Sequence, residues 1–221
     1  MAKSPYATRK PRFRNKRASQ HAALVGQIVW ASNTLHATFS AIFTALLRSI
    51  SPDEPYKGGD VAGEIWHALR SDDLQRTVLL AAAHSILEDR RRDIKSLAWA
   101  LQMAGRLSEY RNDAVHTPFT MVLSSWRPWA GWEPSPDSAG HPHRVAKLHR
   151  VGPAKLFRHV IGDLTQLDGY AVAILDRIYA GKPLPLPKRP LLRSIQLVRQ
   201  SPPQSNKRRR LKAKRRLQLE A

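Results

Sequence analysis

Apolar residues return every three or four positions through most of this chain, and that period restricts its fold more than any other feature. An α-helix turns once in about 3.6 residues, so this spacing gathers the apolar side chains on one face of a helix. The expected architecture is therefore all-α, a bundle of four to five helices. We predict these helices at residues 18–47, 61–69, 72–90, 93–116 and 153–179.

The first of these helices is unusual because residues 18–47 contain no Asp, Glu, Lys or Arg. A membrane-spanning helix would lack charge in the same way. However, Asn33, His36 and Ser40 would then lie near the centre of the bilayer, where polar groups without partners cost free energy. We therefore expect no membrane span. Instead, we expect a long helix covered on one side by the core and on the other by a second chain.

The formal net charge of +20 is concentrated at the two ends of the chain. Residues 1–18 contain seven Lys and Arg and no acid, and residues 182–221 contain thirteen with a single Glu. Dense runs of like charge repel one another and stay disordered. We therefore divide the chain into a basic disordered arm (1–18), a helical domain (19–180) and a Pro-rich and basic tail (181–221).

The basic ends predict a nucleic-acid partner. We expect this partner to be RNA, although DNA or a ribonucleoprotein would also agree with the charge. Lys and Arg that neutralise phosphates release condensed counterions, which gives strong binding at low salt without sequence preference. A tail that maintains solubility, or one that contacts anionic lipid, would have the same composition. The residues expected to contact nucleic acid are Arg12, Arg14, Lys207, Arg208, Arg209, Arg210, Lys212, Lys214, Arg215 and Arg216.

An irregular insertion rich in Trp and Pro occupies residues 118–153. Within it, residues 121–125 and 145–148 are predicted to pair as short strands. Its tryptophans would either stack on bases or hold the loop against the helical body. They are Trp126, Trp129 and Trp132.

The chain contains no cysteine, which excludes disulfides and thiolate-bound metals. His141, His143 and His149 have no carboxylate or cysteine at a ligand spacing, so we expect no metal site and no cofactor. The basic N-terminal segment lacks a short apolar core and a small-residue cleavage site. We therefore expect no signal peptide and a cytoplasmic protein.

The segment 109–116 closes the most regular apolar helix of the chain and contains Arg111, Asn112 and His116. Arg followed by Asn, three further residues and His resembles the signature of the HEPN superfamily, helical-bundle proteins of which many are metal-independent RNases. The resemblance implies an HEPN-like fold and catalytic roles for these three residues. It also implies a homodimer and an endoribonuclease that acts as a toxin, a defence effector or an RNA-processing factor.

The same residue types suit RNA cleavage on chemical grounds. Attack by the 2′-hydroxyl of the RNA needs a base for that hydroxyl, an acid for the leaving 5′-oxygen and positive charge beside the phosphorus. Histidine, with a pKa of about 6.5, can act as base or acid near neutral pH. Arginine keeps its charge and offers a planar fork of donors to phosphate oxygens. Asn112 would hold the imidazole or a group of the RNA by hydrogen bonds.

The spacing within the motif complicates this mechanism. His116 follows Arg111 by five positions, which places the two side chains about 140° apart on a regular helix. Either the helix distorts near Asn112, or the arginine and the histidine reach the RNA from different protomers. A single imidazole also cannot be base and acid in one step, and a twofold dimer would supply two.

Two non-catalytic interpretations remain open. In the first, Arg111 pairs with Asp113 or Glu109, and His116 only caps the helix. In the second, the chain is a basic helical module that binds RNA or DNA without cutting it. A test for RNA cleavage in the presence of EDTA distinguishes these two interpretations from a metal-independent ribonuclease.

Overall fold

The computed structural model describes residues 16–49, 55–117, 119–122, 131–134, 147–148, 151–181 and 185–200. Its described residues form six helices and one two-stranded hairpin, which confirms the all-α class with one helix more than the sequence predicts. The elements are α1 (Lys16–Arg48), α2 (Pro55–Ala68), α3 (Asp72–Ile86), α4 (Arg91–His116), β1 (Phe119–Val122), β2 (Gly131–Pro134), α6 (Pro153–Tyr179) and α7 (Arg193–Gln200).

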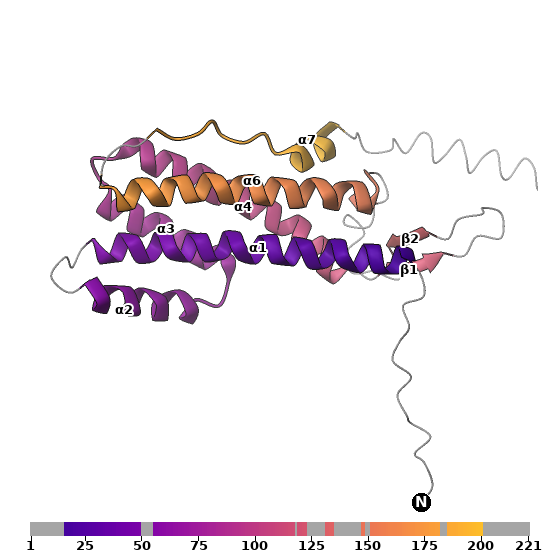
Figure 1. The fold of residues 1–221 in the computed structure, drawn as a ribbon, viewed down its shortest axis with the longest axis horizontal. Helices are drawn as coiled ribbons and strands as arrows, with labels where there is room; N and C mark the ends of the chain where they lie inside the picture. Colours follow the sequence, from indigo (N-terminus) through magenta and orange to yellow (C-terminus); the bar gives the residue numbers. More distant parts are fainter. Residues whose placement is uncertain are drawn as a thin grey trace, which may run out of the picture.

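The two longest helices, α1 and α6, lie side by side and form the most extensive contact between any two described elements (Figure 1). α2 packs on α1 from the side opposite α6, and α3 and α4 also contact α1. Four helices of the same chain therefore contact α1. Part of its uncharged surface stays exposed, including Trp30, which is 77% exposed, so the second chain expected on this helix stays a prediction. No helix in the described part of the chain is long and apolar enough to cross a membrane.

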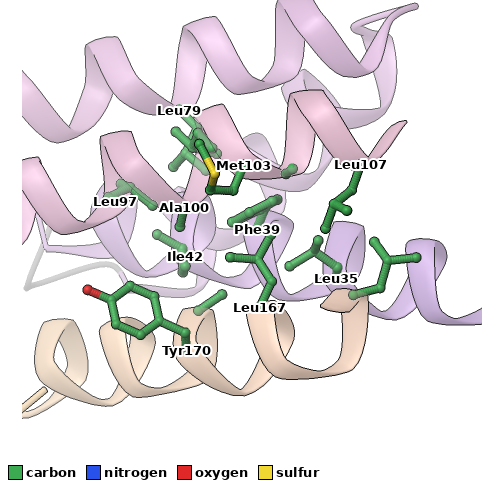
Figure 2. Packing of buried hydrophobic residues seen from close by; sticks show 14 of the residues in the cluster. Leu35, Phe39, Ile42, Leu79, Leu97, Ala100, Met103, Leu107, Leu167 and Tyr170 are labelled. Atoms are coloured by element: carbon green, nitrogen blue, oxygen red, sulfur yellow. The ribbon is translucent and has the colours of Figure 1, made fainter. Parts of the chain in front are cut away.

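The core lies where α1, α3, α4 and α6 meet, and Figure 2 shows their side chains converging there. Fully burying one side chain of leucine size stabilises the fold by about 1.5–3 kcal/mol, so this layer dominates the stability of the bundle. Its residues include Leu35, Phe39, Ile42, Leu79, Leu97, Ala100, Met103, Leu107, Leu167 and Tyr170.

A buried ionic network joins the start of α4 to the end of α6. The Nε of Arg177 donates to Oδ1 of Asp93 at 2.7 Å, and the Nε of Arg90 donates to Oδ2 of the same carboxylate at 2.7 Å. Arg90 also donates to the backbone carbonyl of Arg177 at 2.9 Å. The side chains of Asp93 and Arg177 are almost fully buried. Removing the Asp93 carboxylate would leave the buried charge of Arg177 without its counterion, which typically costs about 3–5 kcal/mol.

α7 was not predicted from the sequence, and a residue of α6 accounts for its start. The carboxylate of Asp163 accepts hydrogen bonds from the backbone N–H groups of Arg193 and Ser194 at 2.9 and 2.7 Å. It therefore satisfies donors that the first turn of a helix leaves without partners. Leu192 and Ile195 are buried beside it. The described residues 185–200 thus lie on the bundle, although they belong to the segment assigned from sequence to the tail.

The insertion after α4 contains a hairpin, but not the predicted one. β1 pairs antiparallel with β2, with Phe119 opposite Pro134 and Val122 opposite Gly131. The predicted pairing of residues 121–125 with 145–148 is wrong, because Lys147 and Leu148 are helical. The observed pairing closes a shorter loop, which costs less conformational entropy.

Candidate functional site

The segment predicted to carry the chemistry forms the last two turns of α4. Helix α4 continues as a regular α-helix to His116, and the backbone N–H of Thr117 still donates to the carbonyl of Asp113 at 3.3 Å. The helix is therefore not distorted near Asn112, and the first of the two geometric alternatives is wrong. On this regular helix, Arg111 and His116 point in directions about 140° apart.

Arg111 lies on the face of α4 that also carries Ala104 and Ser108, seven and three positions earlier. Its side chain is half-buried, and one guanidinium nitrogen donates to Oδ1 of Asn112 at 2.9 Å. The buried Nε of Arg111 has no hydrogen-bond partner among the described residues. A buried donor without an acceptor is uncommon in native proteins and costs free energy.

Asn112 and His116 occupy different environments. Asn112 is half-buried and holds the arginine rather than the histidine, since its Oδ1 accepts the bond from Arg111. The side chain of His116 is exposed at the end of α4. The structure therefore joins Arg111 and Asn112 by a hydrogen bond. His116 shares the face of α4 on which Asn112 lies, but points about 140° away from Arg111.

Asp113 has a structural role beside the motif. Its buried carboxylate forms an ion pair with Lys147, whose ammonium lies 4.6 Å from the centre of the Tyr110 ring. Burial raises the pKa of Tyr110, and the nearby carboxylates of Glu109 and Asp113 raise it further.

A pocket lies against Ala104 and Ser108 of α4, one turn and more before Arg111, which is not among the residues that line it. The volume in which the centre of a water-sized group can lie is about 40 Å³. One water molecule requires about a third of this volume. The pocket can therefore take a group of phosphate size but not a whole nucleotide. Residues that line it come from α1, α2, α3, α4 and α6, and they include Ser32, His36, Trp66, Asp72, Gln75, Arg76, Ser108 and Leu164.

His36 projects from α1 into this pocket, and the sequence analysis did not identify it as a site residue. Burial lowers the pKa of the His36 imidazole; Arg76, His67 and Arg111 lower it further, while the Asp72 carboxylate opposes them. His36 is therefore neutral near pH 7 and keeps a lone pair for accepting a proton. Its ring centre lies 5.3 Å from that of the buried Trp66.

Arg76 is the arginine among the residues that line the pocket. Its side chain is mostly buried and forms an ion pair at 3.2 Å with Asp73, whose own side chain is 90% exposed. Such an exposed pair contributes little to stability. Asp72, which also lines the pocket, places a further carboxylate near Arg76. The guanidinium lies over Gly105 of α4, where an added Cβ would sit 3.6 Å from its Nε. The only sequence signal for this site was the position of His36 in an uncharged helix.

The remaining predicted residues cannot be placed in this site. Arg12, Arg14 and all the basic residues predicted between 207 and 216 lie outside the described residues. The same holds for Trp126, Trp129 and the three histidines at 141, 143 and 149. Within the described part of the chain, no group of three or more His, Asp or Glu side chains is arranged to hold a metal ion.

Comparison of the chain with protein-family models, with curated proteins and with solved structures finds no match.

Proposed function

We propose that this chain is a metal-independent endoribonuclease of HEPN type, which cleaves RNA through attack of the 2′-hydroxyl on the adjacent phosphorus. The observation that carries this proposal is the state of Arg111. Its half-buried guanidinium is fixed by Asn112 and presents an Nε–H without an acceptor. Such a preorganised donor suits the charge that develops on phosphate oxygens in the transition state.

In this proposal each motif residue has a separate task. Arg111 stabilises the phosphorane, Asn112 orients the Arg111 guanidinium, and His116 gives a proton to the leaving 5′-oxygen. Because Arg111 and His116 diverge on one regular helix, they cannot meet on one phosphate within one chain. A twofold homodimer that places His116 of one chain beside Arg111 of the other would complete the site.

The basic ends of the chain would hold the RNA backbone and raise its local concentration at the site. An enzyme of this kind would act in the cytoplasm as a toxin, a defence effector or an RNA-processing factor. A binding module that does not cut remains the alternative, and the exposed position of His116 away from Arg111 favours it.

The test is cleavage of labelled single-stranded RNA in EDTA by the parent protein, by Arg111→Ala and by His116→Ala. We expect the parent to cleave and each variant to lose about 10²–10⁴-fold in rate while keeping its RNA affinity and melting temperature. A matched RNA with a 2′-deoxy sugar at the scissile position should resist the parent. A parent that binds RNA but does not cut it would establish the binding module instead.

A further inference from the structure

We infer that the groove between the amino-terminal ends of α1 and α6 binds one nucleotide unit of single-stranded RNA, with Lys155 and Arg158 against its phosphate. This groove shares no lining residue with the pocket that His36 lines, and it contains no residue of the Arg111–His116 motif. The inference rests on the RNA partner of the proposed function, but it does not depend on whether that RNA is cut.

The groove has the room that a nucleotide requires. By the measure that gives about 40 Å³ for the pocket at His36, its volume is about 330 Å³. Binding sites for small molecules and cofactors typically measure about 300–1,000 Å³. The groove therefore accepts a whole nucleotide, which the smaller pocket does not. The residues that line it are Gln20, His21, Leu24, Gly152, Pro153, Ala154, Lys155 and Arg158.

The charge around the groove is positive. Lys155 and Arg158 line it, and the lining includes no Asp or Glu. Neither cation forms an ion pair with a carboxylate of the described residues. The first acid of α6 is Asp163, and its carboxylate already accepts hydrogen bonds from the backbone of α7. The two permanent cations therefore remain for phosphate oxygens, to which lysine and arginine are suited donors.

The direction of the two helices adds to this positive charge. His21 packs against Phe157 near the start of both helices. Further along both, the hydroxyl of Thr38 donates to Asp168 at 2.6 Å, so α1 and α6 run in the same direction (Figure 1). Neither helix has an acid in its first turn, and the N-cap residue of α6, Gly152, has no side chain that could accept from the first N–H groups. The positive ends of two helix dipoles therefore lie on the side of the groove.

The remaining lining of the groove suits a base. Leu24 and Pro153 present apolar surface, and His21 presents a flat ring. The centre of this ring lies 5.9 Å from that of the buried Phe157, and this contact restricts its movement. Burial lowers the pKa of His21, so the imidazole is uncharged near pH 7. Flat side chains, histidine among them, stack on unpaired bases, so the groove can hold a base while the two cations hold its phosphate.

The site can be tested on the full chain without substitution. Adenosine 5′-monophosphate is titrated into the protein, and the imidazole signals of His21 and His84 are followed by NMR. We expect the His21 signal to shift with saturation, whereas His84, which is exposed on α3 outside the groove, should not respond. Inorganic phosphate should shift His21 only at higher concentration, because it has no base to stack.

A short single-stranded RNA identifies the natural source of the nucleotide. The RNA carries 2′-O-methyl sugars, so it lacks the nucleophile and stays intact during the measurement. It should shift His21 in the same way at a lower concentration than the mononucleotide, because the basic ends of the chain hold its neighbouring phosphates.

Substitution at Ala154 changes the charge of the groove without weakening the fold. Ala154 is exposed at the start of α6, where an added acid favours the helix. Ala154→Glu should therefore lower the affinity for the mononucleotide about tenfold or more while the melting temperature stays equal or rises. Ala154→Gln has the same size without the charge and should bind like the parent.

Loss of either cation should have a similar effect. Lys155→Gln and Arg158→Gln should each weaken binding about tenfold, the effect of losing one hydrogen bond to a charged group. Arg92→Gln is the control, because it removes the same charge from an exposed residue beside Asp93, which contacts the far end of α6. This variant should bind like the parent.

The outcomes separate this site from the proposed activity. No shift of His21 at saturating mononucleotide, or equal affinities of Ala154→Glu and Ala154→Gln, would overturn the site. A shift with the mononucleotide that the RNA does not reproduce would overturn RNA as its ligand. If the parent cleaves no RNA but His21 responds as expected, the proposed activity fails and the site stands. If the parent cleaves RNA while Ala154→Glu binds the mononucleotide as the parent does, the site fails and the activity stands.

Discussion

Replacing Arg111 in one subunit and His116 in the other distinguishes a site shared between two chains from a site built within one. The two residues lie five positions apart on a helix that stays regular to its end, so their side chains diverge by about 140°. In a twofold dimer, each of the two sites would combine Arg111 of one chain with His116 of the other. A heterodimer of Arg111→Ala with His116→Ala then retains one site with both residues intact.

The expected activity follows from counting these sites. Co-expression with two different affinity tags allows the heterodimer to be purified, and we expect about half the cleavage rate of the parent dimer, since one of two sites is complete. Each homodimeric variant should lose about 10²–10⁴-fold. Cleavage of the same labelled RNA in EDTA measures all three.

A second heterodimer provides the control. It pairs the parent chain with a chain that carries both substitutions, so it contains the same four residues in a different arrangement. A shared site predicts that this species is inactive, because each site lacks one residue. If it retains about half the activity and the first heterodimer has none, Arg111 and His116 act within one chain and our reasoning from the helix geometry is refuted. A fully active monomer in sedimentation at micromolar concentration would refute it equally.

Three further predictions concern stability and binding. Asp93→Asn should lower the free energy of unfolding by about 3–5 kcal/mol, measured by urea denaturation, because two arginines lose their carboxylate; an unchanged midpoint would contradict the ionic network. Stability should fall as the pH drops below 6.5, since the lowered pKa of His36 means that the unfolded chain binds a proton there before the folded one does. The variant His36→Gln should show a weaker fall over the same range. Deleting residues 1–15 and 201–221 removes thirteen Lys and Arg and one Glu, lowering the formal net charge from +20 to +8. The slope of log affinity for RNA against log salt should then decrease by about one unit per lost phosphate contact, and an unchanged slope would show that these ends do not hold the RNA.

The helices of the bundle could be predicted from sequence where the apolar period was uninterrupted. The helix expected at residues 153–179 is confirmed as α6, and α4 begins two residues before the expected position. α7 was missed because its start depends on Asp163, a residue of another helix thirty positions earlier. No local sequence pattern predicts a helix cap that a residue so distant in sequence provides. The prediction of the hairpin failed for a related reason. The Trp- and Pro-rich insertion has no regular spacing of apolar residues that would select one strand pairing.

The candidate site could be predicted only in part. Residue types and spacing identified Arg111 and Asn112, but not that Asn112 holds the arginine, which depends on side-chain conformations. His36 and Arg76 escaped because they lie forty positions apart and meet only when α1 packs against α3 and α4. Membership of the HEPN superfamily and RNA binding by the basic ends remain predictions.

The pairing of α1 with α6 has a consequence for the synthesis of the chain. α1 is complete at Arg48, whereas α6, its most extensive contact, begins only at Pro153. A ribosome that adds about 5–20 residues per second needs roughly 5–20 s to cover the residues between them. During that interval the apolar face of α1 has no α6 to bury it. The nascent chain should therefore depend on chaperones until its C-terminal third emerges, and a protein truncated before α6 should aggregate rather than fold.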